Sequence, residues 1–225
     1  MPHLSRVPLL FIHIPKTGGT TVEWAMRNLD NNIQFLESAR IHPSWQKFGH
    51  SPQHCTAQEL RELGINLRKY QLFTVVRHPY ERVVSEYNYQ LALPPKWSKI
   101  IKDDKSDRLS FDEFLTAFLD RSREAIERFD NHQLSCVDYL ANSDGVVDPS
   151  IKVVTYSKQK LIKDVAARLV FKNPSEKMKF ESASFRKDMF CPTVFPVNAL
   201  TEEHKKLIQE AFAKDFDHFG GSASW

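Results

Sequence analysis

A cationic side chain, two glycines and three threonines lie close together near the start of the chain, in the segment PKTGGTT at residues 15–21. The apolar run at residues 9–14 is typical of a buried strand, and residues 22–26 are compatible with a helix. A strand, a glycine loop and a helix direct backbone N–H groups and the positive end of the helix at one point, which suits a phosphate group. We therefore predict an anion-binding loop here.

The residues of this loop have distinct expected roles. Gly18 and Gly19 let the backbone approach an anion without an intervening Cβ. Thr20 and Thr21 can cap the helix and offer hydroxyl groups, and Lys16 can reach negative charge that develops on a transferred group. The order differs from the nucleotide P-loop, G-x-x-x-x-G-K-[ST], because the lysine precedes the glycines. A simple turn between strand and helix is the alternative for this segment alone.

A second polar group follows another predicted strand, residues 71–76. Arg77 stands at the carboxyl end of that strand, and Ser85 lies two turns inside a helix predicted for residues 80–91. In open α/β sheets the carboxyl ends of the strands line the ligand crevice. A guanidinium there can bind a phosphate with two hydrogen bonds. The two stretches together predict a site for two phosphate-like groups.

These two segments resemble the motifs of sulfotransferases that use 3′-phosphoadenosine 5′-phosphosulfate (PAPS), and look closest to the branch with heparan sulfate 2-O-sulfotransferase and its bacterial relatives. The resemblance implies that residues 13–21 bind the 5′-phosphosulfate end, with N–H groups and hydroxyls from Thr17 onward around the 5′-phosphate. It also implies that Arg77 and Ser85 hold the 3′-phosphate. One departure is His78, where the family more often has Asp, which affects only the local loop geometry.

A histidine between the two motifs is the expected catalytic base. An acceptor hydroxyl must lose its proton as it attacks, and a neutral imidazole accepts a proton well near pH 7. The resembling enzymes have a Gly-His pair in this interval, and its histidine is read as the base. The resemblance therefore implies that His50, which follows Gly49, has this role. His54 is the second candidate, and a structural histidine in a surface loop is the alternative.

Two later segments also carry expectations from the resemblance. In the family a loop before the last helix closes over the adenosine phosphate, which makes Ser184, Arg186 and Lys187 candidates for cofactor binding. Asn131 and Gln133 resemble an Asn-x-Gln element of bacterial relatives. They either orient the substrate or the catalytic loop, or cap the next helix.

The composition of the chain bears on the number of domains, on possible partners and on the cellular compartment. A chain of 225 residues with 41% hydrophobic content is expected to form one domain over residues 1–225. The formal charge of +3 gives no support to nucleic-acid binding. The three cysteines have no CxxC spacing, which favours reduced thiols in the cytosol, and the nine histidines form no metal-ligand array along the chain. No run approaches the roughly 20 apolar residues of a membrane span. We therefore expect a cytoplasmic protein, or a soluble piece of an anchored enzyme.

The predicted elements indicate one fold class. Capping boxes mark helices at residues 56–63 and from Ser110. A third strand is predicted at residues 151–156, followed by a helix over 157–170, and the last helix runs from Thr201 to about residue 216. We expect an α/β fold in which a mostly parallel sheet, flanked by helices, carries a P-loop-like 5′-phosphosulfate-binding loop and the site along the strand carboxyl ends.

The expected reaction is in-line transfer of a sulfuryl group from PAPS to an acceptor hydroxyl, with 3′-phosphoadenosine 5′-phosphate (PAP) as product. His50 removes the proton, Lys16 stabilises charge on the leaving oxygen, and no metal is required. The acceptor is expected to be a glycan or a small molecule, and the resemblance favours a carbohydrate. Two alternatives stay open: a P-loop-like nucleotide kinase, which needs Mg²⁺, and a non-catalytic binder of nucleotide or sulfated glycan.

Overall fold

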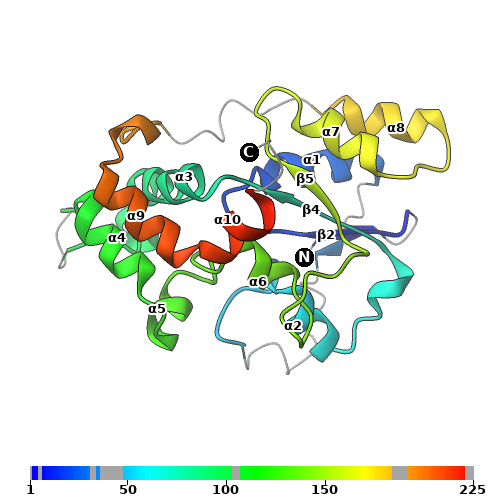
Figure 1. Ribbon diagram of the computed structural model, residues 1–225. Coiled ribbons are helices and arrows are strands. Elements are labelled where there is room, and N and C mark those ends of the chain that lie inside the picture. Colours follow the sequence, from blue (N-terminus) through cyan, green and yellow to red (C-terminus); the bar gives the residue numbers. More distant parts are fainter. Residues whose placement is uncertain are drawn as a thin grey trace.

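One mixed β-sheet lies at the centre of the fold (Figure 1). The computed structural model describes residues 2–4, 7–30, 34–35, 48–102, 107–183 and 192–220. The parallel strands are β2 (Leu9–Ile12), β4 (Gln71–Val76) and β5 (Lys152–Thr155). β1 (Pro2–Leu4) pairs in antiparallel orientation with β2 and with β3 (Gln34–Phe35). The strand order is β3-β1-β2-β4-β5. The predicted α/β fold with a parallel sheet flanked by helices is confirmed.

Helices cover both faces of the sheet, and the side chains of β2 point alternately toward the two helical layers. Leu9 and Phe11 are buried on one face, and Leu10 and Ile12 are buried on the other. The first face is covered by α1 (Gly19–Leu29), α7 (Leu161–Arg168) and α8 (Pro174–Glu181), which lie together above the sheet in Figure 1. The second face is covered by α2 (Ala57–Glu62) and α6 (Cys136–Leu140), which lie below it.

A separate hydrophobic cluster holds a helical layer beside the sheet. It is built by α3 (Pro79–Ala92), α4 (Phe111–Leu119), α5 (Arg123–Arg128), α9 (Glu202–Ala211) and α10 (Ala213–Phe219). Phe114, Phe129 and Phe212 are buried at its centre. Because only Arg77 and His78 separate β4 from α3, this layer begins directly at the carboxyl end of the sheet.

Short 3₁₀ helices complete the described secondary structure, at Pro52–His54, Leu67–Lys69, Pro95–Trp97 and Val197–Ala199. The predicted capping boxes at Thr56 and Ser110 are both confirmed. His78 caps α3 by accepting a hydrogen bond from the Tyr80 backbone N–H, so the departure from Asp keeps a cap at this loop.

Several predicted boundaries differ from the structure. The last helix is two helices, α9 and α10, which meet at Phe212, and the helix after β5 begins only at Leu161. α8 was not predicted, because its charged sequence shows little apolar periodicity.

Cys55 and Cys136 are free and buried, as expected for reduced thiols, while Cys191 lies outside the described residues. Within the described ranges, none of the helices has the length and apolar character that crossing a membrane requires.

Candidate active site

A cavity of about 780 Å³ opens where β2 and β4 end. The pairing of Leu9 with Gln71 and of Ile12 with Thr74 brings the carboxyl ends of these parallel strands together. As a result, both predicted phosphate-binding segments reach the same cavity. The predicted binding residues among those that line its wall are Lys16, Gly18, Gly19, Thr20, Thr21, Arg77 and Ser85.

The helix after the first loop is capped by a glycine. Gly18 is the N-cap residue of α1, with φ 88°, and no side chain caps this helix end. The expectation that Thr20 and Thr21 cap the helix is therefore wrong, because both lie inside its first turn, where they line the cavity. An anion at this end would meet the backbone N–H groups of an 11-residue helix.

Neighbouring side chains leave no space for a Cβ at either glycine of the loop. A Cβ on Gly19 would lie 2.2 Å from Nε2 of His13, and one on Gly18 would lie 2.8 Å from the Tyr156 ring. His13, which follows β2, thus packs directly against the start of α1. Close packing, in addition to access for an anion, explains why the loop has two glycines here.

The two polar residues at the start of the loop behave differently. The Thr17 hydroxyl donates a hydrogen bond of 2.8 Å to the Ile14 carbonyl, and Thr17 is fully buried, away from the cavity wall. Its side chain stabilises the loop and leaves only its backbone for a ligand. Lys16 lines the cavity, and its Nζ lies 3.6 Å from the centre of the Tyr89 ring.

Arg77 connects the two predicted phosphate-binding segments. Its Nη1 donates to the Lys16 carbonyl at 3.2 Å, and its Nε donates to Glu81 at 3.0 Å. The guanidinium carbon also lies 4.4 Å from the centre of the Tyr156 ring. These contacts fix the orientation of a cation in the cavity wall, next to Ser85. This arrangement suits recognition of a phosphate.

The remaining sequence candidates divide into two groups. Asn131 and Gln133 are buried, and the Asn131 side chain donates to the His54 carbonyl at 3.2 Å, which favours a positioning role over direct substrate contact. Ser184, Arg186 and Lys187 lie outside the described residues.

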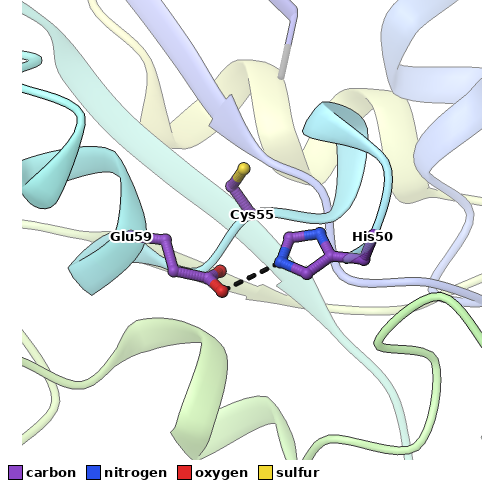
Figure 2. A group of neighbouring side chains, drawn as sticks. All are labelled: His50, Cys55 and Glu59. Carbon is purple, nitrogen blue, oxygen red and sulfur yellow. Dashed lines mark hydrogen bonds and ion pairs between the residues drawn. The ribbon is translucent and has the colours of Figure 1, made fainter. Parts of the chain in front are cut away.

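His50 does not reach the cavity. It is buried, and its Nδ1 and Nε2 hydrogen-bond to the Ser51 carbonyl and to Glu59 Oε1, each at 2.9 Å (Figure 2). Both partners are acceptors, so both ring nitrogens carry a proton. Burial opposes this charge, but the Glu59 carboxylate raises the pKa of His50. A buried imidazolium without a lone pair is unsuited to remove a proton from an acceptor, so the geometry argues against the role expected for His50.

The His50–Glu59 pair instead holds the loop that precedes α2. Glu59 also accepts the Thr56 backbone N–H through its second oxygen, at 2.6 Å, so one carboxylate fixes both ends of the segment between His50 and Thr56. This segment contains His54. His50 is therefore a positioning residue for the cavity wall.

We expect His50→Gln to destabilise the protein by about 1–3 kcal/mol at pH 6, because it removes a partner of a buried charged pair. The raised pKa of His50 means that its contribution is complete below the ordinary histidine value of about 6.5 and declines as pH rises through the folded value. The stability difference between wild type and variant should therefore be smaller at pH 9. Thermal unfolding of both proteins at the two pH values measures it. An equal difference at both pH values contradicts the charged state assigned to His50.

His54 has the geometry of a general base. It lines the cavity, and its Nδ1 donates to Asp130 Oδ2 at 2.8 Å. Burial lowers the pKa of His54 to about 3, so the ring is neutral at pH 7. Burial opposes ionisation of Asp130, but the hydrogen bonds from His54 and from the Ser51 backbone N–H lower its pKa. With the proton held on Nδ1, the lone pair is on Nε2, to which no described residue donates a hydrogen bond.

Two further histidines line the cavity and were not singled out in the sequence. His13 and His132 each hydrogen-bond through Nδ1 to a buried carboxylate, Glu23 at 2.6 Å and Glu86 at 2.7 Å. Burial opposes ionisation of Glu86, but its interactions with His132 lower its pKa to about 2. Glu86 follows Ser85 on α3, and this proximity to the phosphate motif was the available sequence signal.

A buried arginine, also missed in the sequence, ties the cavity segments together. Arg82 is 2% exposed, and its Nε donates to the Pro15 carbonyl at 3.2 Å. Its Nη2 donates to the carbonyls of His132 and Leu134 at 2.7 and 2.6 Å. The first loop, α3 and the segment that carries His132 are thereby fixed relative to one another.

A model of the sulfotransferase family matches residues 5–220 of the chain. The matched region includes every described residue of the cavity wall, from His13 to Val197. No match was found among curated proteins or among solved structures.

Proposed function

The chain belongs to the sulfotransferase family, and on this basis we propose that it transfers a sulfuryl group from PAPS to an acceptor hydroxyl. The observation that carries the proposal is the arrangement in one cavity of two phosphate-binding segments and a neutral imidazole, His54, held by Asp130. We also propose that, within this family, the chain is most similar to the branch with heparan sulfate 2-O-sulfotransferase. It also treats residues 1–225 as a single sulfotransferase domain.

The cavity wall provides a place for each end of the donor. The start of α1 and the hydroxyls of Thr20 and Thr21 suit the 5′-phosphosulfate, since helix N-termini bind anions. Arg77 and Ser85 suit the 3′-phosphate. The hydrogen bond from Arg77 to the Lys16 carbonyl keeps the two subsites at a fixed separation.

Bound PAPS supplies the sulfuryl group and leaves as PAP. His54 Nε2 takes the proton of the acceptor hydroxyl, and Asp130 stabilises the imidazolium that forms. The Lys16 ammonium stabilises negative charge on the leaving oxygen, together with the N–H groups at the start of α1. The buried Glu86–His132 pair lies on the same wall, and the positive charge of Lys16 is felt at Glu86. In this scheme His54 replaces His50 as the base.

The open side of the cavity supports a carbohydrate acceptor. Trp97, which is 62% exposed, lines the cavity together with Lys99 and Arg128. An exposed indole offers a flat apolar surface for the face of a sugar ring, and the cations suit an acidic substituent. We therefore propose a glycan hydroxyl as the acceptor.

Transfer of labelled sulfate from PAPS to a panel of acidic glycans, neutral sugars and small alcohols tests this function. We expect transfer to at least one glycan class, and we expect it to persist in EDTA. PAP binding without transfer to any acceptor contradicts the enzymatic proposal. Transfer of phosphate from ATP that requires Mg²⁺ contradicts it in favour of a kinase.

A further inference from the structure

Two histidines and one carboxylate of the cavity wall are grouped like the ligands of a transition metal. One donor nitrogen from each of His54 and His132 and one carboxylate oxygen of Asp130 all lie within 4.8 Å of one another. The two rings meet edge to face, with centroids 4.7 Å apart. This array is not visible along the chain, because His54 lies far in sequence from the other two residues. We propose that this cluster binds a Zn²⁺-like divalent ion.

The surroundings of His132 are those of a metal ligand. Ligating histidines almost always donate their second ring N–H to a carboxylate or carbonyl, which fixes the tautomer. Glu86, which is fully buried, accepts from His132 Nδ1 at 2.7 Å. The lone pair of His132 is then on Nε2, where no described residue donates a hydrogen bond. His54 is at present hydrogen-bonded to Asp130 through Nδ1 at 2.8 Å, and this contact would be exchanged for bonds to the ion.

Small side-chain rotations would bring the three donor atoms to the separations found in a zinc site. Zinc bonds of about 2.0–2.2 Å place tetrahedral ligand atoms roughly 3.3–3.6 Å apart. The three donors already lie within 4.8 Å of one another, so rotation of the side chains can bring them to these separations. The Asp130 side chain is 35% exposed, so it has room to turn toward the ion. All three residues line the cavity, which leaves a path for the ion and a fourth position for water.

The donor set selects the kind of ion. Two imidazole nitrogens and one carboxylate oxygen suit Zn²⁺, Co²⁺ or Ni²⁺, whereas Mg²⁺ and Ca²⁺ prefer oxygen ligands. Magnesium should therefore neither bind here nor compete with zinc.

A second group of possible ligands, His50, Cys55 and Glu59, is a weaker candidate. Its donors also lie within 4.8 Å of one another, but both nitrogens of His50 are already hydrogen-bonded. The Cys55 thiol is 1% exposed, and Figure 2 shows its sulfur directed away from the His50–Glu59 pair. None of the three lines the cavity. A metal at this second group would carry a thiolate ligand, so the two sites can be told apart by spectroscopy.

The consequence for activity rests on the proposed function, whereas the binding of metal does not. An ion that binds His54 and Asp130 takes up both groups that form the proposed base. Zinc should therefore inhibit sulfuryl transfer reversibly, and EDTA should restore it.

Titration of the metal-free protein with Co²⁺, followed by visible absorption, tests the site, with calorimetric titration of Zn²⁺ alongside. We expect one equivalent to bind without a thiolate-to-cobalt charge-transfer band. His132→Gln should weaken binding at least 10-fold, and Glu86→Gln should weaken it about 10–100-fold by removing the support of the ligand. His218→Gln, which removes an exposed histidine from α10, is the matched control and should bind like wild type.

PAP binding reports folding of each variant and separates the two proposals. Absence of Co²⁺ binding, equal binding in His132→Gln, or a thiolate band in the wild-type spectrum overturns the metal site, and the wild-type spectrum decides this even if a variant fails to fold. If the wild-type protein binds PAP but no metal ion, the metal site is refuted and the proposed function is not. Metal binding by a protein that does not bind PAP supports it and defeats the proposed function.

Discussion

His54→Gln is expected to lower turnover by about 10²–10⁴-fold, the usual contribution of a positioned general base. Glutamine keeps a polar side chain in the wall but cannot accept the acceptor proton. Because His54 faces the acceptor proton rather than the phosphates in our scheme, PAP affinity should change little. Steady-state turnover with saturating PAPS, together with calorimetric PAP titration of the same preparation, measures both effects.

The matched control is His50→Gln, four residues earlier in the same segment. It removes an imidazole of equal size that has no access to the cavity. This variant should lose stability, as argued above, while its folded fraction turns over far faster than His54→Gln. Full activity in His54→Gln, or loss of the catalytic step only in His50→Gln, contradicts the assignment of the base.

Lys16→Met should reduce turnover by about 10²–10³-fold, the cost of removing one group that stabilises charge in the transition state. Methionine keeps the unbranched stem beside Tyr89 but has no charge. The charge on the leaving oxygen develops only during transfer. The loss should therefore appear in turnover, while the affinity for PAPS falls much less. Single-turnover kinetics together with PAP titration separate the two quantities.

Lys158→Met tests whether the position of the charge matters. Lys158 also lines the cavity but lies after β5, outside the first loop. If a general positive field were sufficient, the two variants would lose activity equally. Our account expects a clearly smaller loss for Lys158→Met, and near-normal turnover in Lys16→Met contradicts the role of Lys16.

The sequence located the two segments that line the cavity well because their signals are local. Residues 71–76 form a mostly apolar run, and Arg77 follows it directly, so the strand and its carboxyl end could be located without tertiary information. The capping box at Thr56 is equally local, since its partner Glu59 is three residues away.

The choice between the two histidines could not be made in this way. His50 and His54 lie in the same short segment, and what distinguishes them is a pair of carboxylates. Glu59 stabilises the protonated form of the first, while Asp130, 76 residues beyond His54, orients the second. Contacts at such separation leave no periodic pattern in the sequence. The same holds for Arg82, whose partners are carbonyls distant along the chain.

Thr17 shows a further limit of motif reading. Its place between Lys16 and the glycines suggested a ligand hydroxyl, yet the hydroxyl turns back to the Ile14 carbonyl. A threonine side chain in a tight loop can satisfy its own backbone or a ligand, and the sequence alone does not distinguish these.

Calorimetric titration of the protein with PAP, AMP and ATP in the absence of metal tests the central claim most directly, because it requires no knowledge of the acceptor. Our account predicts a clear preference for PAP, at least 10-fold over AMP, that is lost in Arg77→Ala because the 3′-phosphate then has no guanidinium partner. Equal affinity for PAP and AMP, or a preference for ATP that appears with Mg²⁺, would contradict the assignment of this cavity to PAPS.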